Sequence, residues 1–373
     1  MPAHNATARR SVLTGTIFLT AILALLLAVG VSSAPAKRAS VPSGFFGMVN
    51  QNASSPADMK RMEGGGVEFL RLPLPWDQVQ TTKNGPLNWS YIDSQVKHAA
   101  EAGVKVLPFI YSSPGWLTSK YTKLPVASSK QISAWKTFMK AAVRRYGPNG
   151  DFWSTKNGNV PPSTTQPIRV WQIWNEVNFH YFAEPVSPTN YAKLLKVTKP
   201  ALRSVDPKAK IMLSGLYGSP NGSSRKAMDA DKFLARLYAA RAKPNFDSVA
   251  LHPYSPTTHQ LKLLVTGFRK VLTRNGDRGT PMNITELGWG SDSATVFGKG
   301  SLGGQARQLK SGYSYLIKAR RKLNLRSVYW FSWRDMPKST PTCNFCYRSG
   351  LFKSGTGFKA KPAWNAFRSF SGG

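Results

Sequence analysis

The sequence predicts a (β/α)8 barrel, and two features carry this prediction. From residue 44 onward, short runs of β-branched and aromatic residues alternate with stretches of helical periodicity, and eight such runs can be placed. No linker-like change of composition divides the chain after that point, so one domain is the economical interpretation. A length of 373 residues would allow two domains, but single barrels of this type often reach that size.

The predicted elements follow one another in a regular order. Each predicted strand is bounded by turn residues, and several predicted helices end at Gly or just before Pro. The predicted strands are 44–50, 68–76, 104–114, 168–178, 210–218, 246–254, 282–289 and 326–335. Helices are predicted between the strands, for example over 91–102, 131–146, 190–205, 229–242 and 305–322. In such a barrel the functional residues lie at the carboxyl ends of the strands.

The first 36 residues have the pattern of an export segment. Arg9 and Arg10 precede an almost uncharged apolar run over residues 12–31, and small residues follow it. We therefore expect a signal peptide over residues 1–36 and a secreted, extracellular barrel domain over residues 37–373. Two alternatives stay open. The arginine pair also fits a twin-arginine signal, and about 20 apolar residues are enough for an uncleaved membrane anchor.

The charge balance of the chain is strongly basic. Lys and Arg number 51 against 17 Asp and Glu, which gives a formal net charge of +34. With 41% hydrophobic residues and scattered Pro and Gly, the chain is neither a disordered polycation nor a coiled coil or collagen. Such a charge attracts polyanions. Because the basic residues are dispersed and no DNA- or RNA-binding motif is present, we expect anionic cell-wall or matrix polymers rather than a specific nucleic acid. A merely solvated basic surface is an equal alternative.

The two cysteines, Cys343 and Cys346, form one Cys-x-x-Cys motif. In a cytosolic chain this spacing would suggest redox chemistry, whereas an exported chain favours a local disulfide that pins a loop. A zinc site would need two further ligands nearby, and the sequence offers none there. We therefore expect no metal and no cofactor.

Two glutamates end predicted strands. The chain has only six glutamates, and Glu176 closes the fourth predicted strand while Glu286 closes the seventh, both with aromatic neighbours. Cleavage of a glycosidic bond requires two such carboxyls: one protonates the leaving oxygen, and the other attacks the anomeric carbon or activates a water. For an isolated glutamate a helix cap or an ion pair would be the favoured alternative. The placement of this pair at one barrel mouth favours catalysis.

At these segments the sequence resembles clan A of the retaining glycoside hydrolases, most closely family 39 and then family 5. The resemblance rests first on Trp174-Asn175-Glu176 followed by Asn178, with Val177 standing where these families usually have Pro. It extends over nearly all of the chain after the export segment. Further resembling segments are Arg71, 87–93, 103–108, 114–116, 145–147, 252–254, 350–352 and 361–367.

The resemblance implies that Glu176 is the acid/base and Glu286 the nucleophile. Carboxyls about 5 to 5.5 Å apart would leave no room for a water between them, so the anomeric configuration would be retained. Arg71 and Tyr254 would hold Glu286 ionised, and its charge would raise the pKa of Glu176 and keep that acid protonated.

Three polar residues near the glutamates are also candidate site residues. The amide of Asn175 would bind the sugar 2-hydroxyl, where hydrogen bonds strengthen in the transition state. His252 and Tyr254 would orient the nucleophile. A lone His on a strand is more often a core residue, but the His-x-Tyr pair at this barrel mouth favours function.

Tryptophans near the predicted strand ends are candidates for stacking against a sugar ring. They are Trp76, Trp116, Trp289, Trp330 and Trp333. Core packing is an equal alternative for any one of them. Trp330 and Trp333 have opposite strand parity, so at most one is expected to form the floor of the site.

The sequence therefore predicts a secreted, monomeric glycosidase that hydrolyses O-glycosidic bonds of a polysaccharide or oligosaccharide. The alternative is a non-catalytic cationic protein that binds cell wall or glycan on the same scaffold. Loss of one carboxylate would mark that alternative, and both carboxylates are present. Sugar selectivity resides in loop shape and is not predicted.

Overall fold

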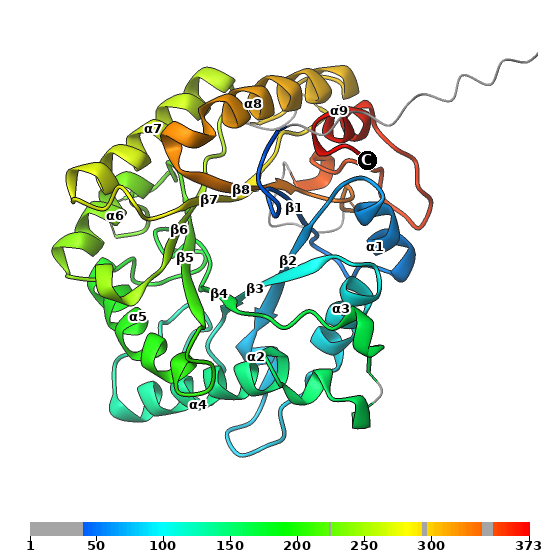
Figure 1. Ribbon diagram of the computed structural model, residues 1–373. Helices are drawn as coiled ribbons and strands as arrows, with labels where there is room; N and C mark the ends of the chain where they lie inside the picture. The colour runs from blue at the N-terminus through cyan, green and yellow to red at the C-terminus, as the bar shows by residue number, and fades with distance from the viewer. Residues whose placement is uncertain (1–39, 158, 224, 293–296, 338–345) are drawn as a thin grey trace, which may run out of the picture. The chain divides into compact units, whose positions relative to one another are not determined.

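Eight parallel strands close into a barrel, with β8 hydrogen-bonded to β1 (Figure 1). The structure is a computed structural model of the chain, and the barrel belongs to the compact unit Pro35–Gly373. The described residues are 40–157, 159–223, 225–292, 297–337 and 346–373. The strands are β1 (Phe46–Val49), β2 (Phe69–Pro75), β3 (Lys105–Tyr111), β4 (Val170–Ile173), β5 (Lys210–Tyr217), β6 (Ser248–His252), β7 (Met282–Leu287) and β8 (Leu325–Phe331). The predicted (β/α)8 barrel is confirmed.

Helices surround the barrel on its outside (Figure 1). They are α1 (Pro56–Glu63), α2 (Trp76–Val79), α3 (Ser90–Glu101), α4 (Ser129–Tyr146), α5 (Pro188–Arg203), α6 (Ala230–Ala239), α7 (Thr258–Arg274), α8 (Leu302–Leu323) and α9 (Pro362–Ser371). Short 3₁₀ helices are η1 (Asp151–Trp153), η2 (Thr155–Asn157), η3 (Pro162–Thr164), η4 (Lys243–Asn245) and η5 (Cys346–Arg348). The five predicted helices correspond to α3, α4, α5, α6 and α8. The sequence analysis gave no range for α1, α2, α7 or α9.

Two predictions fall outside the described residues. The expected export segment over residues 1–36 lies there, and so does Cys343, the expected disulfide partner of Cys346. Both stay predictions. Within the described ranges, no helix is both long and apolar enough to cross a membrane.

Side-chain caps fix the starts of four of the surrounding helices. A hydroxyl accepts a hydrogen bond from a backbone N–H in the first turn of α4, α5, α7 and α8. The capping residues are Ser128, Ser187, Thr257 and Ser301. Each cap satisfies a backbone donor that the helix itself leaves unpaired. Because these helices follow strands of the barrel, the caps also set where the intervening loops end.

Side chains fill the barrel interior. A small apolar cluster there includes Val49, Leu107, Met212 and Tyr329, which come from four different strands. Gly47 on β1 leaves space for the ring of Tyr329, because a Cβ at this position would lie 2.2 Å from its Cδ1. The interior is therefore a packed core rather than a channel.

Asp58 of α1 fixes the segment that follows β8. Its carboxylate accepts hydrogen bonds from Trp333 Nε1 at 2.7 Å and Arg334 Nη2 at 2.6 Å, and it forms a capping box with Ser55. Burial alone would raise the pKa of Asp58, but hydrogen bonds from Trp333, Ser55 and Arg334 lower it below the ordinary value of 3.8. One carboxylate thus joins the end of the barrel to its first helix.

Replacement of Asp58 by Asn should lower the free energy of unfolding by about 2 kcal/mol near neutral pH, because charge-assisted hydrogen bonds are lost. The folded-state pKa is depressed, so this stabilisation is present above the unfolded pKa and disappears as the pH falls through the folded pKa. Urea unfolding should therefore show a smaller difference between the variant and the wild type in acid. Glu101→Gln, at an exposed carboxylate of α3, is the control. An equal loss at both pH values would contradict this account.

Candidate active site

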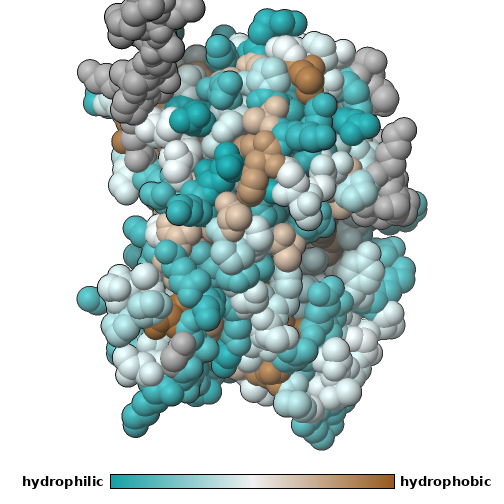
Figure 2. Space-filling model, turned by 90° about the vertical axis from the view of Figure 1, so that its right-hand side faces the viewer, coloured by the Kyte–Doolittle hydropathy of each residue, from teal (hydrophilic) through white to brown (hydrophobic). Residues whose placement is uncertain are grey.

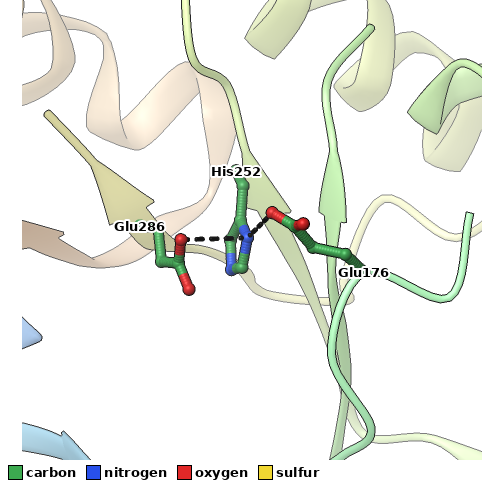
Figure 3. A group of neighbouring side chains, drawn as sticks. All are labelled: Glu176, His252 and Glu286. Atoms are coloured by element: carbon green, nitrogen blue, oxygen red, sulfur yellow. Dashed lines mark hydrogen bonds and ion pairs between the residues drawn. The ribbon is translucent and has the colours of Figure 1, made fainter. Parts of the chain in front are cut away.

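A cavity of about 600 Å³ lies at the carboxyl ends of the strands. The predicted polar residues that line it are Arg71, Asn175, Glu176, Tyr254 and Glu286. His252 lies between the two glutamates (Figure 3). One carboxylate oxygen of each glutamate and a ring nitrogen of His252 all lie within 4.8 Å of one another. The barrel thus brings together side chains that are far apart in the sequence.

Arg71 of β2 is fully buried and distributes its donors among three residues. Nη1 donates to Glu286 Oε1 at 2.5 Å, Nε to Gln172 Oε1 at 2.6 Å, and Nη2 to Asn175 Oδ1 at 2.7 Å. The guanidinium carbon also lies 3.9 Å from the centroid of the Phe109 ring. Because Asn175 accepts through its carbonyl oxygen, the group that it can offer to a substrate is its amide nitrogen.

An irregular backbone carries Glu176 into the cavity. β4 ends at Ile173, earlier than the predicted strand 168–178, because Trp174 and Glu176 have left-handed φ values of 70° and 37°. Such conformations are strained for residues other than Gly and concentrate at functional sites. The indole nitrogen of Trp174 donates to Phe182 O at 2.7 Å and so fixes this turn.

Asn178 fixes the loop that follows Glu176. Its amide nitrogen donates to the backbone oxygens of Tyr217 and Met228, both at 2.7 Å, and its side-chain oxygen accepts from Tyr217 N at 2.9 Å. Val177, where the resembled families usually have Pro, is fully buried. Asn178 is therefore a positioning residue for the loop that carries Glu176.

His252, at the end of β6, contacts both glutamates. Its Nδ1 lies 2.8 Å from Glu176 Oε1 and 3.5 Å from Glu286 Oε2, and its Nε2 lies 2.9 Å from Thr285 Oγ1. The ring packs against Gly215 of β5, where a Cβ would lie 1.8 Å from Nε2. We expected His252 to orient the nucleophile Glu286, but its shorter contact is with Glu176.

Neighbouring side chains determine which nitrogen of His252 carries the hydrogen. Gln172 accepts from Arg71 through Oε1, so its amide nitrogen donates to Thr285 Oγ1, at 3.2 Å. Thr285 can then give its own hydrogen to His252 Nε2. The hydrogen of a neutral imidazole is thereby placed on Nδ1, where it is donated to Glu176. A continuous chain of hydrogen bonds therefore runs from Arg71 to the carboxyl of Glu176.

Burial and charge separate the pKa values of the two glutamates. Burial raises the pKa of Glu176 well above its ordinary value, and the charge of Glu286 raises it further, against the opposing effect of Arg71. Burial also raises the pKa of Glu286, but Arg71 and the Tyr254 hydroxyl, which donates at 2.6 Å, oppose this rise. Burial and Arg71 lower the pKa of His252 well below its ordinary value, so its ring is neutral. Glu176 consequently keeps its proton to higher pH than Glu286.

The side-chain types of Glu176, His252 and Glu286 would suit a metal ion. Their surroundings do not suit one. Arg71 contacts one oxygen of Glu286 and Tyr254 donates to the other, so a cation would meet a guanidinium and displace existing hydrogen bonds. We therefore assign no metal to this site.

The predicted stacking tryptophans do not line the cavity. Trp76, Trp289, Trp330 and Trp333 are fully buried, so they pack in the core and cannot contact a sugar. Trp116 is half-buried and lies outside the cavity, with its indole nitrogen donating to a backbone oxygen at 3.0 Å. The structure therefore places Trp76, Trp330 and Trp333 in the core and not at the substrate cavity, whereas a contact of Trp116 with substrate stays a prediction.

Other aromatic side chains surround the glutamates. Phe331 lies between the two predicted tryptophans in sequence and lines the cavity, because side chains alternate along β8. The remaining aromatic lining residues are Phe109, Tyr111, Tyr121, Phe179, Tyr181, Phe182, Tyr217 and Phe297. If Trp330 is assigned to the core, the alternation of side chains along β8 predicts that Phe331 faces the cavity. Most of the others lie on loops, where no periodic signal exists.

Comparison with solved structures confirms this architecture. No protein-family model matches the sequence, and no curated protein matches it. The chain is similar in structure to a family 39 glycoside hydrolase from Bacteroides cellulosilyticus, at 18% identity and a TM-score of 0.63, over 89% of this chain and 64% of that one. A monomeric β-xylosidase from Caulobacter crescentus has 19% identity and a TM-score of 0.61, over 89% and 69% of the two chains.

A family 5 glycoside hydrolase from Bifidobacterium longum is also similar, at 14% identity and a TM-score of 0.65, over 88% of this chain and 77% of that one. This chain thus spans less than two thirds of the length of the family 39 enzyme. It spans slightly more than two thirds of the β-xylosidase and about three quarters of the family 5 enzyme. At these identities the likeness shows the fold. The resemblance to family 39 and then family 5 barrels, drawn from the motifs, is confirmed at that level.

Thr285→Val should reduce the ratio of the Nδ1–H to the Nε2–H tautomer of His252 about fivefold, because a hydrogen bond of about 1 kcal/mol to Nε2 is lost. The ¹⁵N chemical shifts of the His252 ring measure this ratio, with the signals assigned by comparison with a His252→Asn variant. Thr285→Ser keeps the hydroxyl and should match the wild type. A wild-type ring with its hydrogen mainly on Nε2, or an unchanged ratio in Thr285→Val, would contradict the assigned chain of hydrogen bonds.

Proposed function

We propose that this protein is a secreted retaining glycoside hydrolase that cleaves O-glycosidic bonds of a polysaccharide or oligosaccharide. The observation that carries the proposal is the Glu176–Glu286 pair. One carboxylate oxygen of Glu176 lies within 4.8 Å of one of Glu286, and the pKa of Glu176 is raised further than that of Glu286. Retaining glycosidases place the two carboxyls about 5 to 5.5 Å apart, whereas inverting ones need about 6.5 to 9.5 Å. Structural likeness to glycoside hydrolases of families 39 and 5 supports the same reaction class.

In the first step Glu286 attacks the anomeric carbon. Arg71 and Tyr254 hold its two oxygens and favour the ionised carboxylate that attack requires. As the bond to the leaving oxygen breaks, Glu176 donates its proton to that oxygen, so the leaving group departs as an alcohol. The product of this step is a glycosyl ester of Glu286 with inverted configuration.

In the second step a water hydrolyses the ester. Esterification removes the negative charge of Glu286, so the pKa of Glu176 falls and its carboxylate can take a proton from the water. The Nδ1–H of His252 donates to Glu176 Oε1 and stabilises this ionised state. The water oxygen bonds to the anomeric carbon, Glu286 is released, and the second inversion restores the original configuration. The amide nitrogen of Asn175 supports both steps by binding the sugar 2-hydroxyl.

Replacement of each glutamate by Ala tests the assigned roles. Glu286→Ala should lose activity on aryl glycosides by at least about 10⁴-fold, and azide should restore it as a glycosyl azide of inverted configuration. Glu176→Ala should keep activity on substrates with good leaving groups, and azide should then give a product of retained configuration. The opposite pattern would exchange the two roles. Glycan binding without turnover by the wild type would favour the non-catalytic glycan-binding alternative.

We also propose that the surface charge holds the enzyme, as a monomer, on an anionic cell-wall or matrix polymer. Removal of residues 1–36, with two arginines and no acid, would leave a charge of +32. Mainly hydrophilic residues cover the face drawn in Figure 2, with only small hydrophobic patches. Among the described residues, Arg71 is the one Lys or Arg that lines the catalytic cavity, and it is engaged with Glu286. The excess charge is therefore available for a partner other than the glycosidic bond.

Raising the salt concentration from about 50 to 500 mM should release the protein from anionic wall material, because the Debye length shortens to a few ångströms. The same change should leave turnover of a small uncharged aryl glycoside nearly constant. Co-sedimentation with the polymer and initial rates measure the two effects in parallel. If turnover of the neutral substrate collapsed while the protein stayed folded, the charge would belong to the active site instead.

A further inference from the structure

A separate cavity, of about 320 Å³, lies between the loop that joins α2 to α3 and the first half of α4. Among the described residues it shares no lining residue with the cavity that holds the glutamates, so we call it the outer cavity. Its lining includes Lys83, Asn84, Trp116, Lys130, Ser133 and Thr137. The tryptophan that the sequence singled out near the end of the third strand thus faces a cavity of its own.

Hydrogen bonds hold the walls of the outer cavity in place. Trp116 Nε1 donates to Gln80 O at 3.0 Å, and Gln80 Nε2 donates to Lys83 O at 3.2 Å. The half-buried ring of Trp116 packs at right angles against the buried ring of Trp76, with the ring centroids 6.1 Å apart. The indole is therefore anchored to the core, and little ordering is needed when a ligand binds beside it.

The outer cavity is basic, and its polar side chains are available. Lys83 and Lys130 line it, and no described Asp or Glu does. Neither lysine forms an ion pair with another described residue. The side chains of Asn84, Ser133 and Thr137 likewise have no hydrogen-bond partner in the part of the chain that the structure describes. All five side chains are exposed, so they can bind a ligand that carries carboxylates and hydroxyls.

A row of cations continues from the outer cavity along α4. Lys136, Lys140 and Arg144 are spaced by four residues, which places them on one side of the helix. Lys130 lies on the same side, and with a rise of 1.5 Å per residue the row from Lys130 to Arg144 is about 21 Å long. α4 contains no Asp or Glu, so these like charges repel one another. An extended polyanion along the row would relieve that repulsion.

The helix dipole accounts for only one end of this row. A cation stabilises the last turn of a helix, which explains Arg144. In the first turn, where Lys130 lies, a cation is unfavourable. An anion bound in the outer cavity would offset this cost, so the position of Lys130 points to an acidic ligand.

The mixture of side chains favours an acidic polysaccharide over other polyanions. The C–H face of a sugar can stack on the indole of Trp116, while its carboxylate binds the lysines and its hydroxyls bind the amide and hydroxyl groups. A membrane surface would require apolar side chains that insert among the lipids, whereas the row on α4 consists of cations. A DNA duplex would use the cations alone and leave the indole without a role.

We propose that the outer cavity binds one sugar of a linear polysaccharide that carries carboxylates, with Trp116 as the stacking surface and Lys83 and Lys130 as the cations. The row on α4 holds the neighbouring sugars of the same polymer. The inference rests on the proposed tethering to an anionic polymer, and it specifies the class of that polymer and the place where it binds. Because the two cavities share no lining residue, the bound polymer leaves the glutamates open to substrate.

Binding to immobilised polygalacturonate tests this inference without any need for catalysis. Surface plasmon resonance at about 100 mM salt, where exposed charges still interact over about 10 Å, gives the Kd. The methyl ester of the same polymer is the uncharged control ligand. The wild type should bind the acid form at least about tenfold more tightly than the ester, because the ester has no carboxylate for the lysines.

The double variant Lys83→Gln, Lys130→Gln should raise the Kd about tenfold, because each lost ion pair contributes about threefold. Trp116→Ala should raise the Kd by a similar factor through loss of stacking, about tenfold. A melting temperature close to that of the wild type shows that each variant is folded. The matched control, Lys310→Gln with Lys318→Gln, removes the same charge from exposed positions of α8 and should change the Kd less than about twofold.

Three other outcomes are defined. Equal losses in the double variant of the outer cavity and in the α8 control would overturn this inference, because binding would then follow net charge alone. Binding of duplex DNA or of phosphatidylglycerol vesicles with the same dependence on Lys83, Lys130 and Trp116 would overturn the assignment to a polysaccharide. Failure of the wild type to bind polygalacturonate would also overturn the inference, whereas the proposed tethering would fail only if wall material also did not retain the protein. The proposed glycosidase activity depends on none of these results.

Discussion

The buried guanidinium of Arg71 is the interaction on which the rest of the site depends. A buried charge is stable only when its hydrogen bonds are satisfied, and Arg71 satisfies them with Glu286, Gln172 and Asn175. Each contact has a chemical consequence. The bond to Glu286 favours the ionised form of that carboxyl. The bond to Gln172 sets the direction of the hydrogen bonds that continue through Thr285 to His252. The bond to Asn175 occupies its carbonyl oxygen, so its amide nitrogen is the group it can offer to a substrate. Without this cation, Glu286 would keep the hydrogen bond from Tyr254 but lose the positive charge that favours its ionised form.

The difference between the two glutamates is also built into the backbone. Glu286 lies on strand β7 beside the cation, whereas Glu176 lies on a strained turn after β4 and contacts the neutral ring of His252. Both are buried, so the low local dielectric strengthens every charge effect between them. A fixed nucleophile and an acid that can change its protonation state are what a two-step displacement needs.

Much of this site could be predicted from the sequence, because strand ends and acidic residues are both visible there. The motif around Glu176 and the placement of Glu286 predicted two carboxyls at one end of the barrel, and the structure places them in one cavity. The contacts of Thr285 and Gln172 could not be predicted, since they depend on how β4, β6 and β7 align across the barrel. Trp330 was predicted as a substrate contact but lies in the core for a related reason. The sequence shows that an aromatic residue is near a strand end, but the direction of its side chain decides whether it faces the core or the cavity. The sequence analysis gave no range for α7 (Thr258–Arg274), although its Thr257 cap is a usual start signal.

Trapping the covalent intermediate tests the central claim most directly. An activated 2-deoxy-2-fluoro glycoside of the accepted sugar slows both steps, and a good leaving group lets the ester accumulate. Mass spectrometry of the intact protein should show one added fluoroglycosyl group, and fragmentation of the peptides should place it on the carboxyl of Glu286. A label on Glu176 would contradict the assignment of the nucleophile. Turnover of a natural substrate with inverted configuration and no label would contradict the two-step mechanism itself.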